Sequence, residues 1–207
     1  FLSQNNPKEH IELLKKATLD INSNIRSIGR EIINKYENIN FIDFYISKLE
    51  KNTIASICGL REVGSINEIE VVIKYLKDKR IGVVKETLNF LAAMDYDNYK
   101  ETFLEYLENE KNGLSNCAKK IIQERVNEYD LNLMYTKLLT QKNENIRLNF
   151  AKLLMKSEKW ESIRFIIMFL EDRNAELSRS AKINYEAWIH NFNRKFTKPN
   201  EYQLSTL

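Results

Sequence analysis

The chain has 207 residues, of which 43% are hydrophobic and 29% are charged, and its net charge is +3. A chain of this length and composition is typical of a soluble globular protein that needs no disulfide or structural metal to complete its core. The small net charge does not by itself predict a nucleic-acid-binding protein, and no run of about 20 apolar residues predicts a membrane span. The two prolines, Pro7 and Pro199, lie near the ends, so the interior favours uninterrupted helices over a β-rich fold.

The spacing of apolar residues predicts a series of helices that follow one another in pairs. The first helix is predicted over 7–18, with Pro7 in its first turn, and the second over 24–36, with Asn24 as its N-cap. The remaining pairs, in chain order, are 39–49 with 52–63, 67–76 with 81–94, 97–107 with 114–126, 130–139 with 145–156, and 158–170 with 175–196. The connections are short, which favours antiparallel neighbours.

The second helix of each predicted pair carries the same apolar stripe. The residues that close this stripe are, in order, Ile33, Leu60, Ala92, Ile122, Leu154 and Tyr185. They return after about 30 residues, a period typical of stacked helix pairs that cover one another's apolar faces. We therefore predict an all-α superhelix of about six antiparallel helix pairs. One repeat domain would cover residues 1–196, and residues 197–207 would form a C-terminal tail.

Segments 66–91 and 160–183 resemble HEAT-like repeats. In both, an apolar first helix ends in Leu-x-Asp and an apolar residue with a nearby basic residue opens the second helix. The residues that carry this likeness are Leu76, Asp78, Val84 and Lys85 in one segment, Leu170, Asp172, Leu177 and Arg179 in the other, and Ile146 with Arg147 in a third helix. The likeness covers about residues 8–196 and is weakest in the opening pair and the pair that includes Leu114. It implies a right-handed superhelix with a concave surface lined by second helices.

Because HEAT-like arrays mostly bind proteins, the resemblance implies a non-enzymatic scaffold or adaptor that binds a protein partner on its concave face. The candidate contacts are basic residues of the second helices: Arg26, Lys85, Lys119 and Arg147. An excess of positive charge on helix 114–126 would attract an acidic partner. We interpret the pairs Asp78 with Lys85 and Asp172 with Arg179 as a structural ladder of ion pairs that sets the register of the helices.

The sequence predicts no catalytic residue, no metal site and no cofactor. His10 and His190 are the two histidines of the chain. They cannot supply the paired His-Glu motifs with which deoxyhypusine hydroxylases, which also resemble HEAT arrays, hold two irons. No Cys/His cluster has zinc spacing, and no Gly-rich phosphate loop is present. Cys58 and Cys117 are expected to be reduced core residues, which favours a reducing compartment.

Nucleic-acid binding is the alternative function, with or without a DNA glycosylase reaction. Alkylpurine DNA glycosylases are also HEAT-like and surround the damaged nucleotide with aromatic and acidic residues. Trp160 and Trp188 lie far apart in the sequence, without a neighbouring acidic motif of that kind. We interpret both tryptophans as core residues, because each falls among the apolar positions of its helix.

The chain begins with Phe1 rather than methionine, which indicates a fragment or a processed product. Together with the helical lead-in, this start gives a weaker resemblance to bacterial HEAT proteins that have an N-terminal membrane anchor and a cytosolic solenoid. That resemblance implies a membrane-associated partner and contact with the membrane only through an anchor upstream of Phe1. The expected location is the cytoplasm, free or tethered to the inner face of the membrane.

Overall fold

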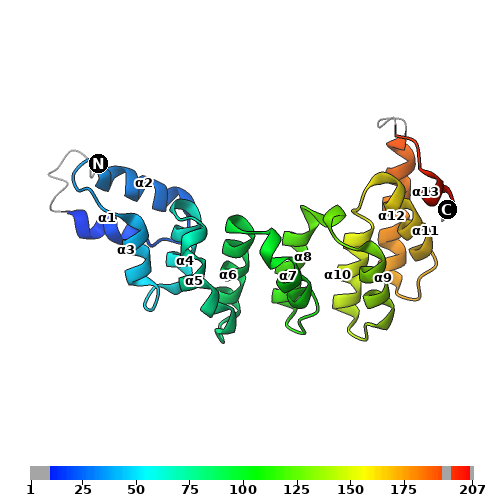
Figure 1. Ribbon diagram of the computed structural model, residues 1–207, viewed down its shortest axis with the longest axis horizontal. Coiled ribbons are helices and arrows are strands. Elements are labelled where there is room, and N and C mark those ends of the chain that lie inside the picture. Colours follow the sequence, from blue (N-terminus) through cyan, green and yellow to red (C-terminus); the bar gives the residue numbers. More distant parts are fainter. Residues whose placement is uncertain (1–9, 193–196, 206–207) are drawn as a thin grey trace. The chain divides into compact units, whose positions relative to one another are not determined.

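The computed structural model is all-α and describes residues 10–192 and 197–205 (Figure 1). The described residues form helices and turns and include no strand, which confirms the predicted fold class. Contacts divide the chain into two compact units, the first ending at Glu101 and the second beginning at Thr102. The single repeat domain over 1–196 stays a prediction, and its residues 1–9 and 193–196 lie outside the described part.

The first unit contains three successive helix pairs. Its helices are α1 (Ile11–Ala17), α2 (Ser23–Asn34), α3 (Phe41–Lys48), α4 (Thr53–Val63), α5 (Ile69–Val72) and α6 (Ile81–Met94). Helix α1 packs on α2, α3 packs on α4, and α4 also packs on α6, so second helices lie next to one another. The first helix of the third pair is irregular, because the 3-10 turns Ile66–Glu68 and Ile73–Lys77 flank the short α5.

The second unit begins within α7 and repeats the same arrangement. Its helices are α7 (Lys100–Leu107), α8 (Asn112–Gln123), α9 (Leu131–Thr140), α10 (Glu144–Leu154), α11 (Lys159–Phe169), α12 (Ala175–His190) and α13 (Glu201–Ser205). Helix α10 packs on α8, α9 and α11, and α11 packs on α12. The segment expected to be a tail includes α13, and Gln203 in α13 donates a hydrogen bond to Glu161 in α11 (3.3 Å).

Asparagine and aspartate side chains begin many of these helices, because their oxygens accept hydrogen bonds from the first free backbone N–H groups. The side chains that cap helices in this way are Asn22, Asn40, Asp130, Asn143 and Asn174. Asn24, the predicted cap of α2, instead donates its backbone N–H to Asn22 Oδ1 (2.9 Å). Because Asn22 caps α2, the helix begins at Ser23, slightly earlier than the apolar spacing predicts.

The apolar stripe of the second helices forms most of the core. Ile33, Leu60, Ile122 and Leu154, which close four of the six predicted stripes, are all fully buried. Ala92 is half-buried. Tyr185 is 37% exposed, and Ile183 and Ile189 on the same helix are also exposed, so α12 presents apolar side chains to solvent.

The two cysteines are buried and free, as expected from the sequence. Burial first, and then the negative charge of Glu86, raises the pKa of the Cys58 thiol to about 11. Its reactive thiolate is therefore scarce at neutral pH. Over residues 10–192 and 197–205, no helix combines the length and the apolar character needed to cross a membrane.

Candidate binding cleft and the predicted site residues

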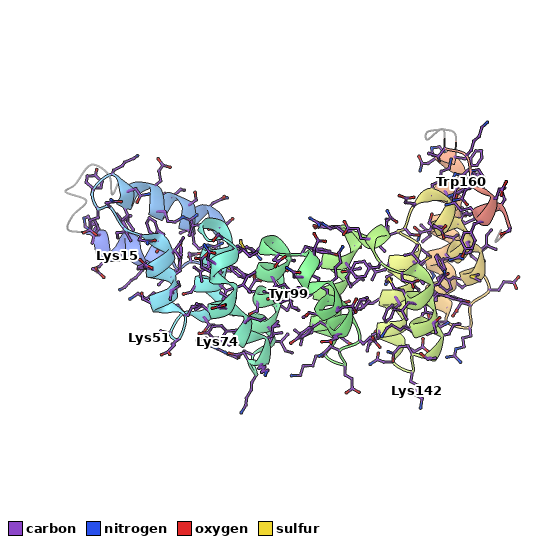
Figure 2. All side chains as sticks on the ribbon, in the orientation of Figure 1. Lys15, Lys51, Lys74, Tyr99, Lys142 and Trp160 are labelled. Carbon is purple, nitrogen blue, oxygen red and sulfur yellow. The ribbon has the colours of Figure 1, made fainter. Side chains whose placement is uncertain are left out.

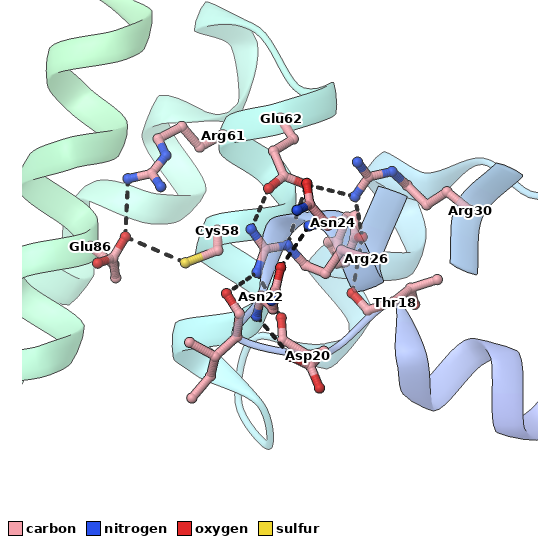
Figure 3. A network of polar contacts seen from close by, with 12 residues as sticks. Thr18, Asp20, Asn22, Asn24, Arg26, Arg30, Cys58, Arg61, Glu62 and Glu86 are labelled. Atoms are coloured by element: carbon pink, nitrogen blue, oxygen red, sulfur yellow. Dashed lines mark hydrogen bonds and ion pairs between the residues drawn. The ribbon is translucent and has the colours of Figure 1, made fainter. Parts of the chain in front are cut away.

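Arg26 lies inside a polar network of the first unit (Figure 3). Its side chain is 2% exposed and pairs with the Glu62 carboxylate, which Arg30 also contacts at 2.7 Å. The Arg26 guanidinium also donates to the backbone oxygens of Asp20 (2.6 Å) and Ile21 (2.7 Å). These bonds give Arg26 a structural role, because they hold α2 against α4 in a buried position. A partner contact by Arg26 stays a prediction.

The two arginines also change the acidity of Glu62. Burial by itself would raise the pKa of this carboxyl group, but the hydrogen bonds and charges of Arg26 and Arg30 hold it below its ordinary value. Glu62 is therefore ionised at neutral pH and serves as the shared acceptor of both guanidinium groups.

Arg147 has a similar structural role in the second unit. Its side chain, on α10, is 8% exposed and forms a fork with both oxygens of Asp172, which lies between α11 and α12. Asp172 also accepts a hydrogen bond from the backbone of Asn174 (2.8 Å). The sequence predicts an ion pair between Asp172 and Arg179, but Asp172 pairs with Arg147, a residue predicted to contact a protein partner. Arg179 is exposed on α12.

The other predicted residues have different surroundings. Asp78 pairs with Arg80 in the turn before α6 (2.8 Å), and hydrogen bonds from Arg80 lower the pKa of Asp78 to about 2. Lys85 is half-buried on α6. Lys119 is half-buried on α8, where burial and then the charges of Lys152 and Lys120 lower its pKa. A partner contact by Lys85 or Lys119 stays a prediction.

Ion pairs do join neighbouring second helices, although with other partners than the sequence predicted. Arg61 on α4 pairs with Glu86 on α6 (3.0 Å), and Lys152 on α10 pairs with Glu176 on α12 (3.0 Å). These pairs are partly exposed, so each contributes at most about 1 kcal/mol to stability. Their main physical effect is to favour one register between adjacent helix pairs.

Replacing Asp172 with asparagine tests the Arg147 pair through its pH dependence. The Arg147 fork outweighs burial and lowers the pKa of Asp172, so the pair stabilises the fold above the unfolded pKa of about 4 and loses this effect as the pH falls through the folded pKa. We expect the variant to lose about 2 kcal/mol at pH 7, with the difference from the wild type shrinking in acid. Urea unfolding followed by tryptophan fluorescence at a series of pH values measures it, and a constant difference would contradict the assignment.

The second unit contains a cleft of about 1030 Å³ between the start of α11, the second half of α12 and the segment that includes α13. Trp160 and Trp188 form part of its wall (Trp160 is labelled in Figure 2). Five side-chain amides also line it: Asn127, Asn184, Asn191, Asn200 and Gln203. Asn127 accepts a hydrogen bond from the backbone of Glu158 (2.8 Å), which fixes the entry to α11.

The tryptophans belong to a three-ring cluster with Phe192. The ring centroids of Trp160 and Trp188 are 5.7 Å apart at an interplanar angle of 74°, and Phe192 lies 6.0 Å from the first and 5.1 Å from the second. Lys159 Nζ lies over all three rings, 5.0 Å from Trp160, 5.8 Å from Trp188 and 4.4 Å from Phe192. It also donates to the Phe192 backbone oxygen (2.7 Å). The aromatic wall is thus organised around an ammonium group.

Both indole N–H groups are already satisfied by the protein. Trp160 Nε1 donates to the backbone oxygen of Thr197 (3.1 Å), and Trp188 Nε1 donates to that of Lys159 (2.9 Å). The first bond holds the segment before α13 against α11, and the second holds α11 against α12. A ligand in the cleft therefore meets ring carbons of the two indoles, with its polar contacts supplied by other side chains.

The interpretation of both tryptophans as core residues misses this cleft. Each is half-buried, not enclosed by the core. An antiparallel hairpin places the start of its first helix beside the end of its second, which is how α11 and α12 bring Trp160 and Trp188 together. This juxtaposition follows from the predicted helix pair and is the signal that could have identified the site.

Positive charge predominates along the cleft. Its charged lining residues are Lys156, Lys159, Lys198 and one carboxylate, Glu158. Lys156 and Lys198 are exposed and have no ion pair within residues 10–192 and 197–205. In that same part of the chain, no group of three or more His, Cys, Asp or Glu side chains is placed to hold a metal ion.

Comparison with known proteins leaves the family open. The chain matches no family model, and no curated protein matches it. The likeness to HEAT-like repeats therefore depends on the motif residues and on the paired helices. Any assignment of function depends on the cleft and on the chemistry of its lining residues.

Proposed function

We propose that the chain is a non-enzymatic interaction scaffold that binds a segment of a protein partner in the cleft of its second unit. The observation that carries the proposal is the tryptophan pair in a cleft of about 1030 Å³. Tryptophan is enriched among the residues that dominate binding energy at interfaces, because it contributes a large rigid apolar surface. A few polar groups around such an anchor then set the orientation of the ligand.

The polar groups of α12 suit a peptide backbone. Asn184, Trp188 and Asn191 follow the i, i+4, i+7 spacing of one helix face. Asn184 Nδ2 donates to the Ser180 carbonyl within α12, and Asn191 Nδ2, at the C-cap of α12, donates to the Ala187 carbonyl, both at 2.8 Å. With their amide nitrogens bonded to the helix, the two side chains present carbonyl oxygens that accept hydrogen bonds from backbone N–H groups of a bound segment.

Cytoplasmic location is part of the same proposal. Free, buried Cys58 and Cys117 support it, because oxidising compartments favour disulfides. The partner would be a cytoplasmic protein or the cytoplasmic part of a membrane protein.

Alanine replacement of both Asn184 and Asn191 tests the proposed contact with a peptide backbone. Peptides are selected from a random display library on the immobilised chain and titrated while tryptophan emission is recorded. The chain has two tryptophans, both at the cleft, so their emission reports on ligands that enter it. We expect the double variant to bind about tenfold more weakly, since it loses two hydrogen-bond acceptors.

Asn116 supplies the control. It is exposed on α8 and does not line the cleft, and its replacement with alanine should leave both affinity and emission unchanged. Selected peptides that bind without any change in tryptophan emission would place the binding surface elsewhere and contradict the proposal.

Binding of single-stranded nucleic acid is the second candidate, favoured by the position of three lysines beside two indole rings. Proteins of that kind combine positive charge along the backbone with aromatic stacking of bases. A labelled oligothymidylate titrated across a salt series tests it. A steep loss of affinity with rising salt supports this function, and absence of binding at low salt rejects it.

A further inference from the structure

We infer that the segment bound in the cleft is an acidic peptide, held by Lys156 and Lys198 against the aromatic wall that Lys159 organises. This inference rests on the proposed function and adds the chemical class of the ligand. Three observations support it: two cleft lysines have no ion pair in the part of the chain that the structure describes, the Lys159 ammonium group lies over the aromatic rings, and the two indoles stand edge to face.

Lys156 and Lys198 approach the cleft from different elements. Lys156 follows the end of α10, and Lys198 belongs to the segment before α13; both are exposed and line the cleft. Carboxylates neutralise some lysines of the unit, as Glu108 does Lys137 and Glu176 does Lys152. Within residues 10–192 and 197–205, the ammonium groups of Lys156 and Lys198 have no carboxylate partner, so they would be complementary to carboxylates of a ligand.

The position of Lys159 disfavours a basic ligand. An aromatic cluster of this kind would suit a cation, but Lys159 Nζ already lies over the three rings and donates to the Phe192 carbonyl. A lysine or arginine of a ligand would have to displace this tethered ammonium and would also face Lys156 and Lys198. Both effects favour a ligand that carries negative charge.

The ring geometry favours a peptide over a nucleic acid. Stacking of bases needs free ring faces, whereas Lys159 covers one face of each indole and the two indoles stand edge to face at 74°. Amide side chains such as Asn184 and Asn191 suit backbone groups of a peptide. The cleft lies at the upper end of the range for small-molecule sites, which is about 300–1,000 Å³, so it has room for several residues.

Three pools of synthetic peptides test the inference. The peptides have about ten residues, extended over roughly 3.3 Å each, and share randomised apolar positions; the pools differ in their remaining residues, which are Glu, Lys or Gln. We expect the Glu pool to bind and to change tryptophan emission, and the Lys pool not to bind. The double substitution Lys156→Glu and Lys198→Glu should weaken binding of the Glu pool by about tenfold or more.

The control variant makes the same change in net charge, with two lysine-to-glutamate substitutions at residues that do not line the cleft. Lys111 and Lys142 belong to the same unit, are exposed, carry no ion pair in the described parts of the chain, and do not line the cleft (Lys142 is labelled in Figure 2). Replacing both with Glu should leave the affinity for the Glu pool within about twofold of the wild type, because charges beyond a Debye length of about 8 Å are screened.

Lys159 requires a separate test because it is a positioning residue. Lys159→Met removes the ammonium from the rings, so we expect altered tryptophan emission in the free protein and weaker binding of the Glu pool. Lys159→Arg keeps a cation over the rings and should restore both. Loss of binding in both variants, or in neither, would contradict the positioning role.

The outcomes separate this inference from the proposed function. Equal binding of the Glu, Lys and Gln pools, or unchanged affinity after reversal of Lys156 and Lys198, would overturn the acidic ligand while leaving a peptide-binding scaffold. If no pool binds, the proposed function itself fails. If the oligothymidylate binds more tightly than the Glu pool and changes tryptophan emission, the cleft belongs to nucleic acid.

Discussion

Replacing Glu62 with alanine is expected to destabilise the first unit by about 3 kcal/mol. The substitution leaves the Arg26 guanidinium, which is 2% exposed, with two backbone oxygens as acceptors and no counter-charge. A buried charge without its partner is more costly than the pair itself is stabilising. The Glu62 side chain is 21% exposed, which places the expected loss at the lower end of the range for buried pairs.

Tryptophan fluorescence cannot follow this loss, because both tryptophans lie in the second unit. Hydrogen exchange of the backbone amides of residues 20–62 measures the loss of stability in the first unit instead. The control is Glu31→Ala, because Glu31 pairs with Lys35 at an exposed site on the same α2 helix (3.3 Å). We expect that control to cost less than about 0.5 kcal/mol. Equal losses of protection in the two variants would show that the Arg26 network contributes no more than a surface ion pair.

The second large effect is expected at Gly59, where the substitution to alanine should cost about 2–3 kcal/mol. A Cβ at this position would lie 2.3 Å from ring atoms of Tyr45. The ring cannot move aside easily: Tyr45 is fully buried, and its hydroxyl donates to the Thr18 carbonyl (3.1 Å) and accepts from Arg30 (2.9 Å). The clash would therefore push α3 and α4 apart and disrupt their packing.

Gly82→Ala is the matched control, since it makes the same change in another helix of the first unit. A Cβ at Gly82 meets Ile54 Cδ1 at 3.2 Å, the flexible end of a side chain. Alanine is favoured over glycine in helices by up to about 1 kcal/mol, so this variant should be neutral or slightly more stable. Thermal unfolding by circular dichroism compares the two; a neutral Gly59→Ala would contradict the close approach of Tyr45 to α4.

The residues predicted for the functional site illustrate where sequence reasoning was limited. Arg26, Lys119 and Arg147 occupy similar positions on second helices, yet two are buried in ion pairs and one is half-buried among lysines. Sequence spacing shows which face of a helix a side chain occupies. It does not show which carboxylate a neighbouring helix brings within a few ångströms, and this decides between a structural and a binding role.

The amino-acid sequence by itself determined the all-α class, the order of the helices and most of their limits, because apolar periodicity, asparagine caps and the scarcity of glycine and proline act over a few residues. Tertiary structure alone decided which charges pair and where an aromatic cleft forms. Asp172 pairs with Arg147 rather than Arg179, and Trp160 meets Trp188, because helix packing brings together residues that are distant in the chain. Such contacts depend on how helices lie against one another, a property that no local pattern contains.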